Sequence, residues 1–253
     1  MSVTKPLSAE SMPLAAAGAT SGVPEGADES PVRSPRWFEL LPPELRDTFR
    51  SLAKVRRPLK GEVLIEEGDL TREILFVREG ALLLQRKGDA GLVCVGVSRP
   101  GQGMVLLPAG GEYASPFTVT ALVDSEVARL AVSDVRRVLG ARPRLAVAIS
   151  GAVAARTGEL RQATALLYRA ASARDKVCEA IRLVGDPCEQ GVRLPAQLGH
   201  ADLAVICGLS RSEVTRKLGE LVKRGLVLKD KDGLVLAQTG VEQANQVRQR
   251  WAA

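Results

Sequence analysis

The stretch "DLAVICGLSRSEVTRKLGELVKRGLV", residues 202–227, has the pattern of two helices joined by a tight turn. Gly208 stands between them, where a residue without a Cβ adopts a left-handed backbone at little cost. Ser210 follows as the predicted N-cap of the second helix, and Glu213, three residues later, completes a capping box. The first helix has one apolar side, made of Leu203, Ala204 and Ile206. The stretch therefore predicts a helix-turn-helix.

The second helix of this motif divides into a buried and an exposed side. Its predicted buried side consists of Val214, Leu218, Leu221 and Val222. Another side carries two arginines and two hydroxyl residues, namely Arg211, Ser212, Thr215 and Arg216. An arginine binds O6 and N7 of guanine through two parallel hydrogen bonds, so such a face at a helix N-terminus suits the major groove. We therefore expect sequence-specific binding to double-stranded DNA.

Positive charge is concentrated around the same helix. Between residues 210 and 231 there are seven basic residues and three acidic ones, which places cations where phosphates would lie. The segment "LVLKDKDGLVLA", residues 226–237, predicts a two-stranded hairpin around Asp232-Gly233. His200, in the first turn of the preceding helix, either faces a phosphate or is a surface residue with no special role. The candidate DNA contacts are Arg211, Ser212, Thr215, Arg216, Lys217, His200 and Lys223.

The part of the chain before this motif has the pattern of many short strands. Glycines punctuate "GEVLIEEGDLTREILFVREGALLLQRKGDAGLVCVGV", residues 61–97, and separate its apolar runs. Strand-like runs resume in "FTVTALV" and "VARLAV" and end near Val132. Short strands with regular glycine turns predict a sandwich or a barrel. The first four expected strands are Val63–Ile65, Ile74–Val77, Ala81–Leu84 and Val93–Val97.

Helices are expected between the strands and the helix-turn-helix. Ser133 is the predicted cap of a helix over "SDVRRVLGARP", and a long helix follows from Pro143 to about Ala171. The long helix either packs on its own barrel or pairs with a second copy. A helix of this length exceeds what a small barrel can cover, which favours pairing. The predicted dimer seam, with coiled-coil-like spacing, consists of Ile149, Val153, Leu160, Ala163 and Leu167.

Composition excludes several classes of protein. No apolar run approaches the roughly 20 residues that a membrane-spanning helix needs, so a cytoplasmic protein is expected. The chain has one histidine and four cysteines without a C-x-x-C pair, which argues against a metal site. The cysteines are expected to be reduced and structural, with a redox role for Cys178 and Cys188 as the alternative. Because no nucleophile, base or metal cluster is evident, neither an enzyme nor a bound cofactor is expected.

The order of these parts resembles the bacterial family of the cyclic-AMP receptor protein and the fumarate-and-nitrate-reduction regulator, the Crp/Fnr family. The resemblance runs from about Trp37 to Gln238 and rests on "GEVLIEEGD", "ILFVREGALLL", "PGQG" and the quoted helix-turn-helix. It implies an α+β fold with an N-terminal β-roll, a long dimerisation helix and a C-terminal winged helix-turn-helix. The expected domains are a disordered tail (1–36), a β-roll sensor domain (37–136), the long helix (137–171), the winged helix-turn-helix (172–240) and a C-terminal helix or tail (241–253).

The resemblance also implies a function. A member of this family would act as a homodimeric transcription regulator on near-palindromic sites, with RNA polymerase as a further partner. Arg211 and Arg216 match positions where relatives read bases, whereas Ser212 stands where many relatives carry Glu. The alternative class is a nucleotide-binding regulatory or scaffold module that does not bind DNA.

The stretch "PGQGMVLLPAGGEYASPFTVTAL", residues 100–122, occupies the place of the family's phosphate cassette. The Gly-Glu of cyclic-nucleotide-binding relatives aligns near Val105-Leu106, and their Arg position falls near Ser115-Pro116. No arginine lies between Arg99 and Arg129, so a bound phosphate would lack its cationic partner. Three states stay open: no effector, an apolar or acidic effector, or a cyclic nucleotide bound in a divergent manner. The residues of this degenerate effector pocket are Val105, Leu106, Ser115, Pro116 and Arg161.

Overall fold

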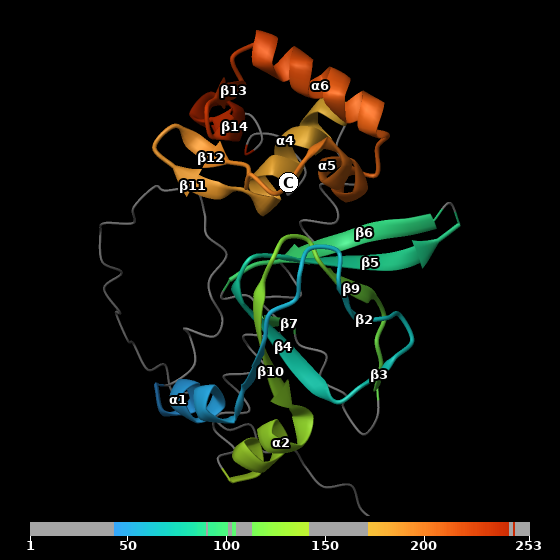
Figure 1. Cartoon of the computed structure of the whole chain (residues 1–253), viewed down its shortest axis with the longest axis vertical. Helices are drawn as coiled ribbons and strands as arrows, with labels where there is room; N and C mark the ends of the chain where they lie inside the picture. Colours follow the sequence, from blue (N-terminus) through green and yellow to red (C-terminus); the bar gives the residue numbers. More distant parts are fainter. Residues whose placement is uncertain are drawn as a thin grey trace, which may run out of the picture. The chain divides into compact units, whose positions relative to one another are not determined.

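The computed structural model describes residues 43–89, 91–100, 103–104, 113–141, 172–242 and 245 (Figure 1). The expected tail and all five residues of the expected dimer seam lie outside these ranges. The first described part runs from helix α1 (Pro43–Leu52) to helix α2 (Val132–Ala141). Helix α2 begins one residue before Ser133, so this serine lies inside the helix and is not its cap.

Ten short strands lie between these two helices. They are β1 (Lys54–Arg56), β2 (Val63–Ile65), β3 (Leu70–Thr71), β4 (Glu73–Glu79), β5 (Leu82–Gly88), β6 (Gly91–Ser98), β7 (Gly103–Met104), β8 (Tyr113–Ala114), β9 (Thr118–Ala121) and β10 (Glu126–Ala131). Each run that the sequence predicted as a strand overlaps a strand of the structure, with ends shifted by a few residues. Strands β3 and β8 have two residues each, and the apolar pattern did not predict them.

The strands form antiparallel sheets that bring distant parts of the chain together. One sheet has the order β1-β10-β4-β7, a second has the order β2-β9-β5-β6, and β3 pairs with β8. Early strands thus pair with late ones, as in a roll. Apolar side chains of both four-stranded sheets form the β-roll core, which consists of Ile65, Leu75, Val77, Leu82, Leu84, Val119, Ala121 and Val127.

The turn between β4 and β5 depends on a glycine. Gly80 has a φ of 83°, and a Cβ placed on it would lie 2.3 Å from Oγ of Ser125. That hydroxyl accepts the backbone N–H of Ala81 and donates to the carbonyl oxygen of Val123 at 2.7 Å. The close approach of two turns therefore excludes any side chain at position 80.

The C-terminal part combines three helices and a second small sheet. Helix α4 (Ala173–Val184) is followed by β11 (Asp186–Cys188) and β12 (Gly191–Arg193). Helices α5 (His200–Cys207) and α6 (Arg211–Lys223) precede β13 (Val227–Asp230) and β14 (Gly233–Ala237). The sheet order is β11-β12-β14-β13, which makes the predicted hairpin the edge of a four-stranded sheet. Asp230 pairs with Gly233, so the turn lies at residues 231–232, one residue before the predicted position.

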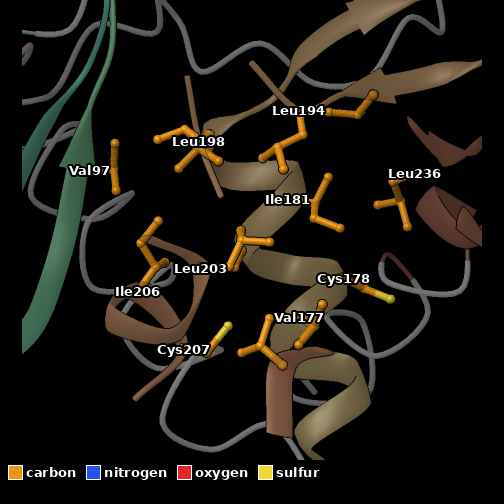
Figure 2. Close-up of a cluster of buried hydrophobic side chains, with 14 of the residues drawn as sticks. Val97, Val177, Cys178, Ile181, Leu194, Leu198, Leu203, Ile206, Cys207 and Leu236 are labelled. Carbon is orange, nitrogen blue, oxygen red and sulfur yellow. The ribbon is translucent and has the colours of Figure 1, made fainter. Parts of the chain in front are cut away.

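Apolar residues of the helices and this sheet share a common core (Figure 2). Val177 and Ile181 from α4 meet Leu203 from α5, and each of the three is fully buried. This core fixes α5 and α6 in place, because side chains at native packing density cannot shift independently. Residues 238–242 after β14 are helical, and most of the C-terminal segment beyond them lies outside the described ranges.

The buried cysteines belong to the cores and not to a reactive site. Burial raises the pKa of the Cys94 thiol to about 11 and those of Cys178 and Cys207 to about 12. A thiol with such a pKa is almost entirely protonated at neutral pH and reacts slowly. Within the described ranges no group of three or more His, Cys, Asp or Glu side chains is placed to hold a metal ion. Among the same residues, no helix is long and apolar enough to cross a membrane.

Candidate nucleic-acid interface

The turn between α5 and α6 is built on Gly208. Its φ of 63° and ψ of 39° are left-handed, and its N–H donates to the carbonyl oxygen of Ala204. The N–H of Leu209 donates to the same carbonyl at 3.0 Å. The left-handed residue ends α5 and redirects the chain, so that α6 starts only three residues later. This confirms the predicted helix-turn-helix.

Ser210 is the N-cap of α6, as predicted. Its Oγ accepts the backbone N–H of Glu213 at 3.2 Å, and its backbone is extended with a φ of −71° and a ψ of 151°. This bond is one half of the predicted capping box. The Oγ of Ser210 also lies 3.1 Å from Oγ of Ser212, which links the cap to the first turn. The cap therefore fixes where the exposed first turn of α6 begins.

The buried side of α6 agrees with the prediction at three of four positions. Val214, Leu218 and Leu221 are buried and belong to the core of this part. Val222 is 40% exposed, so its predicted place in the buried side is wrong. Val222 follows Leu218 by four residues, as a buried position would. However, only Val214, Leu218 and Leu221 pack into the core that α6 shares with α4 and α5. The helix also ends at Lys223, which leaves no later turn to cover Val222.

The opposite side of α6 exposes the four predicted base-contacting residues. Arg211, Ser212, Thr215 and Arg216 are all exposed. The Oγ1 of Thr215 lies 2.9 Å from the carbonyl oxygen of Arg211, to which it donates. The same Oγ1 lies 2.8 Å from Nδ1 of His200, the first residue of α5. His200, which the sequence left without a defined role, is thus joined directly to the exposed face of α6.

Two neighbouring cations on α6, Arg216 and Lys217, share the carboxylate of Glu220. Nη1 of Arg216 lies 2.9 Å from Oε1 of Glu220, and Nζ of Lys217 lies 2.8 Å from Oε2. The hydrogen bond from Lys217 and the charges of both cations lower the pKa of Glu220. The Arg216 side chain is 60% exposed, whereas Lys217 is only 19% exposed and lies along the helix. Arg216 therefore points to solvent more fully than Lys217, although the sequence treated both as DNA contacts.

The hairpin of β13 and β14 is held by an ion pair that the sequence analysis missed. Nη1 and Nη2 of Arg193 on β12 donate to the two carboxylate oxygens of Asp230 at 2.9 and 2.7 Å. Asp230 Oδ1 also accepts the N–H of Asp232 at 2.9 Å. The bonds from Arg193 lower the pKa of Asp230 to about 2. The paired carboxylate holds a turn whose lysines, Lys229 and Lys231, stay exposed.

In the cassette region, the structure describes Ser115 and Pro116 but not Val105, Leu106 or Arg161. Ser115 is 2% exposed, and its hydroxyl donates to the carbonyl oxygen of Phe117 at 2.6 Å. Its backbone N–H donates to the carbonyl oxygen of Asp69 at 2.8 Å, and its own carbonyl accepts the N–H of Gly68. The polar groups of Ser115 are therefore used within the roll.

Comparison with known proteins agrees with this geometry. Residues 55–142 match the cyclic nucleotide-binding domain, and residues 161–239 match the Crp-like helix-turn-helix domain. A strand-rich domain of the first kind joined to a DNA-binding domain of the second defines a class of transcription regulators. The chain belongs to the Crp/Fnr family of this class.

Individual relatives are distant in sequence. The Global nitrogen regulator of a Nostoc species is 22% identical over 199 residues, which cover 72% of this chain and 87% of that protein. FixK2 from Bradyrhizobium japonicum is similar in structure, with a TM-score of 0.63 and 17% identity over 76% of this chain and 96% of that one. A CRP-family regulator from Thermus thermophilus gives a TM-score of 0.60 at 17% identity over 75% and 96% of the two chains. These structural likenesses show the fold.

Proposed function

We propose that this regulator binds near-palindromic DNA sites as a homodimer and that cyclic AMP does not control it. The observation that carries the DNA site is the exposed face of α6, where Arg211 and Arg216 flank two hydroxyl residues directly after a side-chain cap. The first turn of a helix presents unpaired backbone N–H groups, which favour a phosphate nearby. The exposed lysines Lys229 and Lys231 at the hairpin turn suit a second row of phosphates.

The homodimer is supported by the coiled-coil-like spacing of apolar residues between Ile149 and Leu167 in the sequence. In such a dimer two copies of α6 would enter successive major grooves, about 34 Å apart, so the site would repeat with two-fold symmetry. The spacing between the two half-sites of a selected DNA sequence therefore tests for the dimer.

The independence from cyclic AMP is supported by chemistry in the β-roll. No arginine is present from residue 100 to residue 128, and the hydroxyl of Ser115 donates to Phe117 and not toward a ligand. A cyclic phosphate there would lose its hydration without an ion pair, which costs several kcal/mol. The alternative is an effector of other chemistry or a cyclic nucleotide held in a divergent manner. We further propose that the protein works in the cytoplasm and contacts RNA polymerase.

The test is selection of binding sites from random duplexes, followed by gel shifts at rising salt. We expect a near-palindromic consensus and an affinity that falls steeply with salt. Arg216→Ala should lose specific binding, whereas Arg137→Ala, which removes an exposed charge from α2, should bind as the unmodified protein does. No binding to any duplex would support a nucleotide-binding or scaffold module instead. In calorimetry, cyclic AMP and cyclic GMP should give no heat, and tight binding of either would contradict the proposed independence.

A further inference from the structure

A cavity of about 440 Å³ lies at the edge of the β-roll interior. Ile65 and Leu75 belong to the apolar core of the roll and also line this cavity, so its floor continues the core. Its remaining lining includes three arginines, Arg56, Arg72 and Arg129. The volume falls within the range of about 300–1,000 Å³ that is usual for small-molecule sites.

The strand register explains why two of the arginines face this cavity. Arg129 on β10 lies opposite Leu75 on β4, and Arg56 on β1 lies opposite Val127 on β10. Directly opposed residues of an antiparallel pair point to the same side, and so do residues two apart on one strand. Arg56 and Arg129 therefore share the face of the sheet that carries Leu75 and Val127 into the core.

Both arginines keep hydrogen-bonding capacity. Arg129 directs Nε and Nη2 to a single carboxylate oxygen of Glu73, and Arg56 directs Nη2 to Glu62 at 2.5 Å. A guanidinium carries five N–H groups, and within the described ranges neither Nη1 has a hydrogen-bond partner. Each of these two side chains is 38% exposed, so a solute can reach them.

The balance of charge and apolar surface defines the ligand. Arg56 and Arg129 each direct hydrogen bonds to one carboxylate, that of Glu62 and that of Glu73, and each keeps N–H groups for a second acid. Asp69 already accepts the backbone N–H of Glu66 at 2.8 Å, which leaves Glu73 as the carboxylate paired with Arg129. A carboxylate matches a guanidinium in shape and can bind it through two bonds. The apolar floor suits an aliphatic chain.

We propose that this cavity binds a small organic acid, with its carboxylate on Arg129 and Arg56 and its aliphatic chain on Leu64, Ile65 and Leu75. The acid takes up the remaining N–H groups of Arg129 and competes with Glu73 for that guanidinium. The cationic groups come from β1 and β10, whereas the family's phosphate cassette aligns with residues 100–122. None of the lining residues belongs to segment 100–122, although Leu75 pairs with Met104 on β7 and Leu70 pairs with Ala114 on β8. The proposed site does not depend on DNA binding.

The test is a titration of the full-length protein with hexanoate up to about 10 mM, read by calorimetry and by backbone amide shifts at residues 71–73 and 129. Arg129→Gln should weaken hexanoate binding about tenfold, because it removes a charge-assisted hydrogen-bonding partner. Glu73→Gln should strengthen binding, because it removes the competing carboxylate. Arg137→Gln, on α2, is the matched control and should leave the affinity unchanged. If the ion pair of Arg129 and Glu73 were only structural, both substitutions should act in the same direction. Weaker binding in Arg129→Gln and stronger binding in Glu73→Gln would show a ligand site.

Hexanamide and inorganic phosphate complete the design. Hexanamide lacks the negative charge of hexanoate, and inorganic phosphate lacks its aliphatic chain. Both should therefore bind more weakly than hexanoate. The proposal is overturned if hexanamide or phosphate binds as tightly as hexanoate. It is equally overturned if hexanoate produces no saturable response in the unmodified protein and in Glu73→Gln, the variant that keeps both arginines. DNA binding of each variant is measured in parallel, so that failure of either proposal is seen separately.

Discussion

Nδ1 of His200 lies 2.8 Å from Oγ1 of Thr215, whose hydroxyl proton is directed to the carbonyl oxygen of Arg211 at 2.9 Å. A hydroxyl has one proton, so Thr215 donates to the carbonyl and accepts from Nδ1–H of His200. The proton of the neutral imidazole is thereby assigned to Nδ1, and Nε2 is left as an acceptor. The imidazole of His200 thereby holds the Thr215 hydroxyl in place on the exposed face of α6.

This relationship predicts that His200 supports DNA binding by holding the Thr215 hydroxyl in place on the exposed face of α6. His200→Ala should weaken binding to the selected site by about 0.5–1.5 kcal/mol, because it removes one hydrogen bond to that hydroxyl. Fluorescence anisotropy titrations with the selected site measure the effect, and an unchanged affinity in the variant would refute the role.

Arg216 and Glu220 predict a second pair of opposite effects. Arg216→Ala should weaken binding to the selected site by about 1–3 kcal/mol, while changing thermal stability little, because an exposed ion pair contributes at most about 1 kcal/mol. Glu220→Gln should leave specific binding intact or strengthen it and should raise binding to unrelated duplexes. Competition gel shifts with specific and random DNA measure both. Equal losses of specific and random binding in Arg216→Ala would show a phosphate contact in place of a base contact.

The ion pair of Arg193 with Asp230 predicts a change in acid stability. The pKa of Asp230 is lowered to about 2, so its contribution to stability is present above the ordinary carboxyl pKa and is lost as the pH falls toward about 2. In Asp230→Asn, less stability should be lost between about pH 4 and about pH 2 than in the unmodified protein. Urea unfolding across this range gives the measurement, with Asp134→Asn as a control for a carboxylate of another exposed pair. A parallel shift at all pH values would contradict the assignment.

Two glycines with positive φ predict different losses on substitution by alanine. Gly208→Ala meets nothing within 4 Å, so only its left-handed backbone with a φ of 63° is strained, at a cost of about 1–2 kcal/mol. Gly80→Ala adds a clash with Ser125 to a φ of 83° and should cost clearly more, in the range of severe substitutions. Chemical unfolding of the two variants compares them directly. A loss at position 80 no greater than that at position 208 would argue against the close contact of the two turns.

The helix-turn-helix could be predicted from the sequence because its determinants are local. The turn needs a left-handed residue and the helix needs a cap, and Gly208 and Ser210 supply both within three positions. The strands of the roll were found by their apolar runs, but β3 and β8 are too short to show a pattern. Strand β11 has only three residues, one of which is Pro187, so its sequence shows no strand pattern.

Interactions across the fold were not predictable in the same way. His200 and Thr215 are 15 residues apart, and Arg193 and Asp230 are 37 residues apart, so no periodicity connects them. Helical spacing alone also failed at Val222. Its position fits the buried side of α6, but its neighbours leave the side chain exposed. The cationic cavity in the roll was missed for a related reason. The family pattern places the expected arginine in the cassette, whereas Arg56 and Arg129 come from strands 73 residues apart that the register brings side by side.

The carboxylate of Glu220 also affects how such a regulator would search a chromosome. Nη1 of Arg216 donates to a carboxylate oxygen of Glu220, and in the proposed complex the arginine would exchange this partner for a base. Where a guanine offers two acceptors in line, the exchange is favourable, and elsewhere the arginine returns to its own helix. Random stretches of duplex would then hold the protein briefly, and a long residence would be reserved for sites with the correct base. An intramolecular ion pair of small energy would thus set how quickly wrong sites are abandoned.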